Sequence, residues 1–127
     1  MRVEWSAIIS PYTEKAVEDF VAPALPGLAL LAVRHPNGEW QPVEAISADD
    51  IREKLIMRLQ RRQGWLMWRQ CLHLEAPGGG FLPAGFMYAE ISDPEWRRGF
   101  ETYLHDLWGT SGRRKGGAAI SIPGTLP

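Results

Sequence analysis

Cysteine is nearly absent from this chain, because Cys71 is the only one among its 127 residues. A lone cysteine can form no internal disulfide and supplies no cysteine cluster for zinc. Long hydrophobic runs are missing as well. The longest uncharged apolar stretch, residues 21–33, is too short to cross a bilayer as a helix, and it contains Pro23, Pro26 and Gly27. We therefore expect this stretch to lie in the core and the protein to make no membrane contact.

A secretion signal and an excess of one charge sign are also missing. The first ten residues contain one arginine but no continuous apolar segment followed by a small-residue cleavage site. Together with the lone thiol, this predicts a cytoplasmic protein. The 14 Lys and Arg residues stand against 15 Asp and Glu residues, which gives a net charge of −1. The whole molecule is therefore not a general polyanion binder, and a nucleic-acid role requires local segregation of charge.

Common catalytic motifs are absent. The sequence contains no GxSxG, no HExxH and no GxxxxGK[ST]. The glycine-rich segment 77–85, "PGGGFLPAG", lacks the lysine and the helix that a phosphate cradle needs, so we interpret it as a hairpin loop. We expect no cofactor, and we expect the protein not to be an enzyme.

Three histidines are the obvious candidates for a metal site. His35, His73 and His105 would have to meet in space with Asp106 or Glu75, because none of them shows a recognised ligand spacing. We therefore expect no metal.

Cys71 and His73 leave one enzymatic alternative open. On a strand, Arg69, Cys71, His73 and Glu75 share one face, and an imidazole near a thiol can stabilise the nucleophilic thiolate. Residues two apart on a strand lie about 7 Å from each other, beyond hydrogen-bond reach. The face is therefore interpreted as a polar outer surface, with a Cys71 and His73 enzyme as the third hypothesis.

What the chain does contain is typical of a globular domain. Apolar residues make up 45% of it and charged residues 23%, and 127 residues are enough for one hydrophobic core. The unusual feature is six tryptophans. Because tryptophan is enriched at binding hot spots, their number favours an interaction surface.

Hydrophobic periodicity and capping residues predict a single α+β domain over residues 1–127. It has about three helices and a mostly antiparallel or mixed sheet, in the order β-α-β-β-α-β-β-α-β. The N-terminal half contains a strand over 3–9, a helix from a Ser10 cap to residue 21, a hairpin over 28–46 around Asn37 and Gly38, and a helix from a Ser47 cap to Gly64. The C-terminal half contains strands over 65–75 and 86–92, a helix over 94–108 capped by Asp93, and a strand over 118–122. We expect 109–117 to be a flexible basic Gly/Ser loop and 118–127 to be a short strand followed by a Pro/Gly tail.

Three local features refine this outline. Pro42 cannot donate a ladder hydrogen bond, which predicts that its strand is an edge strand or bulged. The helix before Pro23 is expected to bury Val17, Phe20 and Val21. The helix over 94–108 is expected to turn its aromatic and leucine residues inward and its charged residues outward, the latter being Arg97, Arg98, Glu101, His105 and Asp106.

A basic face is predicted on the helix that begins at Ser47. It consists of Lys54, Arg58, Arg61 and Arg62, at positions i, i+4, i+7 and i+8, and only Asp50 balances it along the helix. We expect this helix to end at Gly64, because a continued helix would lose its apolar stripe and hold a glycine in its interior. The strand after Gly64 then presents Trp65, Met67 and Arg69, which are residue types that interface cores favour.

These features predict a small non-enzymatic protein-binding module, for instance an inhibitor, an immunity-type protein or an assembly protein. Its contact surface would join Trp65, Met67 and Arg69 to the basic face, and its partner would present an acidic surface. The alternative is a nucleic-acid-binding protein that uses the same arginines together with the loop "SGRRKGG", which carries Arg113, Arg114 and Lys115.

Overall fold

The computed structural model describes residues 3–63, 73–108 and 125–126, with side chains over 3–60 and 73–106. Within these residues the elements follow the predicted order β-α-β-β-α-β-β-α-β, and three helices with an antiparallel four-stranded sheet confirm the α+β class. The elements are β1 (Val3–Glu4), α1 (Glu14–Phe20), β2 (Gly27–Arg34), β3 (Trp40–Ala48), α2 (Ile51–Gln63), β4 (His73–Glu75), β5 (Phe81–Glu90), α3 (Pro94–Trp108) and β6 (Thr125–Leu126).

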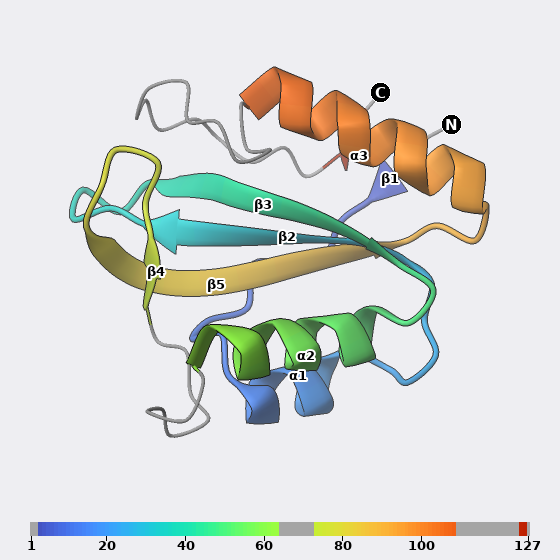
Figure 1. Ribbon diagram of the computed structural model, residues 1–127, viewed down its shortest axis with the longest axis horizontal. Coiled ribbons are helices and arrows are strands. Elements are labelled where there is room, and N and C mark those ends of the chain that lie inside the picture. Colours follow the sequence, from blue (N-terminus) through green and yellow to red (C-terminus); the bar gives the residue numbers. More distant parts are fainter. Residues whose placement is uncertain (1–2, 64–72, 109–124, 127) are drawn as a thin grey trace.

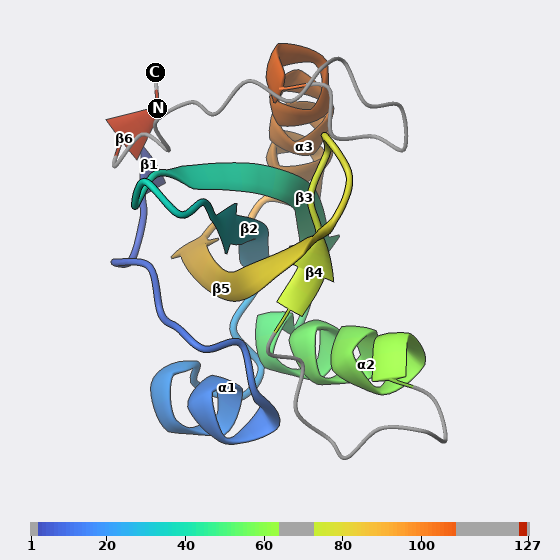
Figure 2. The same cartoon turned by 90° about the vertical axis from the view of Figure 1, so that its left-hand side faces the viewer.

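The molecule is built in three layers. The central sheet has the strand order β3-β2-β5-β4, and all its neighbouring strands are antiparallel. Helices α1 and α2 cover one face of the sheet and α3 covers the other, as Figures 1 and 2 show. Strand β2 is buried continuously from Gly27 to Val33. Because it is covered on both faces, its sequence is a continuous apolar run instead of an alternating one.

Two hydrophobic clusters join the layers. The first lies between the sheet and helices α1 and α2 and includes Leu31 and Leu55. Tyr12 is fully buried within it and donates a 2.6 Å hydrogen bond from its hydroxyl to the carbonyl of Leu55. The second cluster lies under α3 and includes Phe100 and Leu104. Each buried leucine or phenylalanine contributes about 1.5 to 3 kcal/mol relative to an exposed one.

The predicted hairpin is confirmed between β2 and β3. The backbone N–H of His35 donates to the carbonyl of Glu39, and the Asn37 side chain accepts from the Glu39 N–H at 2.9 Å. Only Gly38 of the pair has a positive φ, at 92°. The connection is therefore longer than the tight two-residue turn that an Asn-Gly pair can form.

The prediction for Pro42 is also confirmed. β3 is an edge strand of the four-stranded sheet. Its pairing with β2 passes from Leu31 opposite Glu44 to Ala32 opposite Pro42, so Val43 is an extra residue in a bulge. Both features accommodate a residue that has no backbone N–H.

The N-terminal segment differs from its prediction. β1 ends at Glu4, and the predicted strand does not continue to residue 9. Instead, the Ser6 N–H donates one backbone hydrogen bond to the Tyr88 carbonyl of β5 at 2.8 Å, and Ile9 exchanges two with Phe86 in an isolated bridge, at 2.7 Å and 2.9 Å. These few bonds do not form a regular ladder. The predicted alternation also fails after Trp5, because Ala7 is exposed and Ile8 packs on the same cluster as Trp5.

The predicted start of α1 is also wrong, because the residues before the helix are hydrogen-bonded to β5. Thr13, not Ser10, caps the helix, and its side chain accepts a 3.1 Å hydrogen bond from the Ala16 N–H. The Tyr12 N–H donates to β5, which holds the chain in an extended form up to the cap. Val17 is buried as predicted, but Phe20 is 58% exposed.

The predicted cap of α2 is also wrong. Ser47 lies in β3 opposite Leu28, and the cap is Asp50, whose carboxylate accepts from the Glu53 N–H at 3.1 Å. Asp50 and Glu53 have the spacing of a capping box, three residues on from the predicted Ser47 and Asp50. The prediction fails because strand pairing holds Ser47 in β3. The predicted helix end at Gly64 lies outside the described residues.

β4 and β5 form a hairpin around the glycine-rich segment. β5 begins at Phe81, five residues before the predicted start, because residues 81–83 pair with β4. In β4, Leu74 is buried while His73 and Glu75 are exposed, as predicted for the two strand faces. The remainder of the strand predicted over 65–75 lies outside the described residues.

Helix α3 agrees with its predicted bounds. Asp93 accepts a 2.9 Å hydrogen bond from the Glu95 N–H, which confirms it as the cap. Phe100 and Leu104 are buried as predicted, but Tyr103 is 44% exposed, and the prediction for Arg97 is wrong, because this residue is buried instead of facing outward. The side chains of Glu101 and His105 are only 30% and 17% exposed, so they are also less exposed than predicted. At 15 residues α3 is the longest described helix, and none of the described helices is long and apolar enough to span a membrane.

The last strand lies further along the chain than predicted. β6 pairs with β1 in a separate two-stranded sheet, with Val3 opposite Leu126. It falls in the part of 118–127 that was predicted to be a tail, and the strand predicted over 118–122 lies outside the described residues. The predicted loop 109–117 lies outside them as well.

The close approach of β2 and β5 generates a test of the fold. A Cβ atom at Gly27 would lie 1.9 Å from the carbonyl oxygen of Ala89, a backbone atom that cannot move without breaking the ladder. We expect Gly27→Ala to lower the free energy of unfolding by about 3 kcal/mol, measured by urea denaturation.

The matched control is Gly99→Ala in α3. A Cβ atom there meets nothing within 4 Å. Because alanine favours the helix over glycine, this variant should raise the free energy of unfolding by about 0.5 to 1 kcal/mol. Equal effects of the two substitutions would contradict the packing described for Gly27.

Candidate binding site beside the β3–α2 turn

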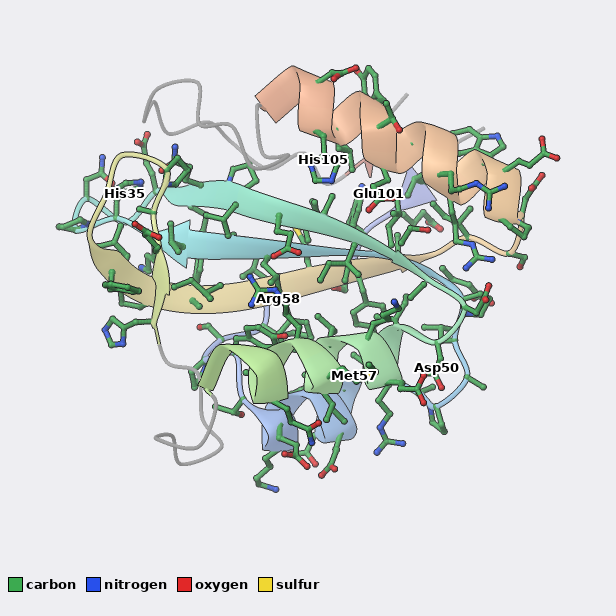
Figure 3. The ribbon with its side chains drawn as sticks, viewed as in Figure 1. His35, Asp50, Met57, Arg58, Glu101 and His105 are labelled. Carbon is green, nitrogen blue, oxygen red and sulfur yellow. The ribbon has the colours of Figure 1, made fainter. Side chains whose placement is uncertain are left out.

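The predicted basic face is partly neutralised by β3. Arg58 donates from Nε and Nη2 to one oxygen of Glu44, at 2.9 Å and 2.7 Å, and the two side chains are only 17% and 33% exposed. In Figure 3 the Arg58 side chain rises from α2 toward the sheet. Asp50, which was expected to balance Lys54, is occupied as the helix cap. Of the described members of this face, Lys54 remains exposed.

The other predicted contact residues lie outside the part of the chain whose side chains are described. They are Arg61, Arg62, Trp65, Met67 and Arg69 of the predicted protein-binding surface, and Arg113, Arg114 and Lys115 of the predicted nucleic-acid or anion-binding loop. Their roles stay predictions.

The three histidines lie on different elements. His35 is in the β2–β3 connection, where its Nε2 atom lies 2.6 Å from Oε1 of Gln41. His73 is in β4, and His105 is on α3 with Nε2 3.8 Å from a carboxylate oxygen of Glu101. Figure 3 shows His35 and His105 at separate places, and the described residues contain no group of three or more potential metal ligands. Cys71 lies outside the described residues, so the pairing of Cys71 with His73 stays untested.

A polar cavity of about 340 Å³ lies where the end of β3 meets the first turns of α2 and α3. We call it the junction pocket. It is lined by Ser47, Ala48 and Asp49 from β3 and the following turn, by Lys54 from α2, and by Pro94, Arg97, Arg98 and Glu101 from α3. Three of these side chains are cationic and two are carboxylates. Lys54 is thus the one predicted contact residue that the described structure places at the pocket.

Arg97 is the most unusual residue of the junction pocket. Its side chain is only 4% exposed. Nη1 donates to the carbonyl of Ala48, and Nη2 donates to a carboxylate oxygen of Asp49 at 2.8 Å, but Nε is buried without a hydrogen-bond partner. A buried cation with an unsatisfied donor is costly, and such groups in native proteins call for an explanation.

The fold places Arg97 there because of its position on α3. It stands three residues before Phe100 and seven before Leu104, so the three side chains share one face of the helix. Phe100 and Leu104 pack into the cluster under α3, and their packing carries Arg97 toward β3. The carbonyl of Ala48 at the end of β3 is thereby satisfied by a guanidinium N–H.

Sequence reasoning missed this site, although a signal was present. Its charge places Arg97 with Arg98 on the outward side of the predicted helix. The spacing of three and seven residues to Phe100 and Leu104 indicates the opposite. The acceptors Ala48 and Asp49 could not have been found in this way, since they are separated from Arg97 by 49 and 48 residues.

No protein-family model, no curated protein and no solved structure matches this chain. The geometry of the junction pocket is therefore the basis for a functional interpretation.

The different surroundings of Arg58 and Lys54 generate a stability test. We expect Arg58→Met to lower the free energy of unfolding by about 1 kcal/mol, because it leaves the half-buried Glu44 carboxylate without its cation. Lys54→Met should change it by less than about 0.5 kcal/mol, because Lys54 is exposed. Urea denaturation of both variants checks this, and the same cost for both would show that the Arg58 and Glu44 pair contributes nothing.

Proposed function

We propose that this protein is a small non-enzymatic binding module that recognises an acidic segment of a partner protein at the junction pocket. Inhibitors, immunity-type proteins and assembly proteins are the classes in which such modules occur, and a lone thiol fits a cytoplasmic setting. The observation that carries the proposal is Arg97, a buried guanidinium with an unpartnered Nε that lines an open polar cavity beside Lys54 and Arg98.

The charge of the pocket favours an anionic group. Lys54, Arg97 and Arg98 oppose Asp49 and Glu101, which leaves an excess of one positive charge. Lys54 and Arg98 are exposed, so an incoming carboxylate can reach them without any rearrangement of the fold. Arginine binds planar carboxylates through parallel N–H donors, which suits the recognition of aspartate or glutamate.

A protein partner fits the described surface better than a nucleic acid does. Nucleic-acid binding depends on several phosphate contacts along a backbone. Here Lys54, Arg97 and Arg98 converge on one cavity, and Arg58 is held by Glu44. Met57, three residues after Lys54 on α2, is 49% exposed, and methionine is enriched in protein interfaces.

Binding of a labelled acidic peptide tests the proposal. Fluorescence anisotropy would compare N-acetylated, C-amidated hexaglutamate with the matching hexaglutamine peptide. We expect only hexaglutamate to bind, with an affinity that falls as salt rises. Lys54→Ala and Arg98→Ala should each weaken binding about fivefold, the equivalent of about 1 kcal/mol.

Lys15→Ala on α1 is the matched control, because Lys15 is an exposed lysine outside the pocket that pairs with Asp19 at 3.2 Å. It should leave the affinity unchanged. Binding of hexaglutamine, or equal losses for Lys15→Ala and Lys54→Ala, would refute recognition at the junction pocket. Tighter binding of an oligothymidine with the same dependence on Arg98 would replace the protein partner by a nucleic acid.

A further inference from the structure

We infer that Asp49 holds the place of the partner's carboxylate in the free protein, and that binding displaces Asp49 from Arg97. This inference rests on the proposed function and concerns the regulation of the same site. Asp49 then acts as a built-in competitor, which keeps the buried guanidinium paired when no partner is bound.

The two members of the pair differ sharply in burial. The Arg97 side chain is 4% exposed, while the Asp49 side chain is 95% exposed. Arg97 cannot leave, because α3 is fixed by the packing of Phe100 and Leu104. Asp49 is already solvated and contacts Arg97 through one hydrogen bond of 2.8 Å, so it loses little when it turns back to water. A buried cation that remains without an anion is far more costly.

The pair of Arg58 and Glu44 shows what a permanent ion pair looks like in the same protein. Both side chains are mostly buried, and two guanidinium nitrogens donate to one carboxylate oxygen. Neither member lines the junction pocket. The Arg97 and Asp49 pair differs in both respects, because its carboxylate is exposed and both residues line the cavity. A carboxylate that enters the cavity can therefore take the place of Asp49 at Arg97.

The class of ligand follows from this exchange. The anion that now contacts Arg97 is a carboxylate, so a carboxylate of the partner can make the same hydrogen bond. Lys54 and Arg98 supply further positive charge that Asp49 leaves free. Side chains and C-terminal carboxyl groups share this chemistry, and the probe peptides distinguish them.

Displacement predicts a gain in affinity when the competitor is removed. When a side chain of the protein occupies the site, a ligand can bind only to the fraction of molecules in which the site is free. The apparent affinity is the intrinsic affinity multiplied by that fraction. Asp49→Asn should therefore bind hexaglutamate about tenfold more tightly than the natural chain. Asp49→Ser should show the same gain, which guards against an effect peculiar to asparagine.

Glu101→Gln is the matched control, because it also removes one carboxylate charge from the pocket but Glu101 lies beside His105, 3.8 Å away. Figure 3 shows Glu101 and His105 on the side of α3 that faces the sheet. A general electrostatic gain should appear in both variants. Only displacement makes the gain for Asp49→Asn several times larger than the gain for Glu101→Gln.

Anisotropy titrations of the three variants and the natural chain provide the test, with circular dichroism to verify folding. Two-dimensional ¹⁵N–¹H spectra would follow the Arg97 Nε–H signal, which should move on addition of hexaglutamate. A second peptide, acetylated hexaglutamine with a free C-terminus, tells whether a terminal carboxylate suffices.

Equal gains for Asp49→Asn and Glu101→Gln, or weaker binding by Asp49→Asn, would overturn the displacement while leaving the proposed function intact. Absence of hexaglutamate binding by the natural chain and by every variant would instead refute the proposed function itself.

Discussion

The continuous burial of strand β2 from Gly27 to Val33 is the constraint on which the other features of this structure depend. Its neighbours β3 and β5 satisfy its backbone, and its side chains need cover on both faces of the sheet. Helices α1 and α2 supply this cover on one face and α3 on the other. The approach is so close at Gly27 that no side chain fits against the Ala89 carbonyl. Three layers follow from one desolvated strand.

The junction pocket is a consequence of this layering. After its last residue, Ala48, strand β3 must turn into α2, and α3 starts on the opposite face near the same end. The end of β3 and the starts of α2 and α3 meet there. Asp50 caps α2 and Asp93 caps α3, so two of the nearby carboxylates are committed to helix termini. Asp49 is not committed in this way and contacts Arg97.

Two arginines contact β3 and the turn that follows it, and their ion pairs differ in how far the carboxylate is exposed. Arg58 reaches Glu44 and forms a half-buried pair that both helps to fix α2 against the sheet and removes one charge from the basic face. Arg97 is buried more deeply, yet its carboxylate partner remains in water and its Nε has no acceptor. The Arg58 and Glu44 pair is partly shielded from solvent on both sides, whereas Arg97 still has a donor that can accept a hydrogen-bond partner. This contrast underlies the proposed recognition of a carboxylate.

The sequence by itself determined the type and order of the elements, the β2–β3 hairpin, the irregularity at Pro42 and the Asp93 cap, because these depend on periodicity and on residues close in the chain. It wrongly predicted Ser10 and Ser47 as helix caps, where the structure has Thr13 and Asp50. Those choices depend on which residues a distant strand engages. Only the tertiary structure decided which charged side chains meet at the site. Arg58 meets Glu44 from 14 residues away and Arg97 meets Asp49 from 48, and no local pattern records which elements become neighbours once β2 is buried.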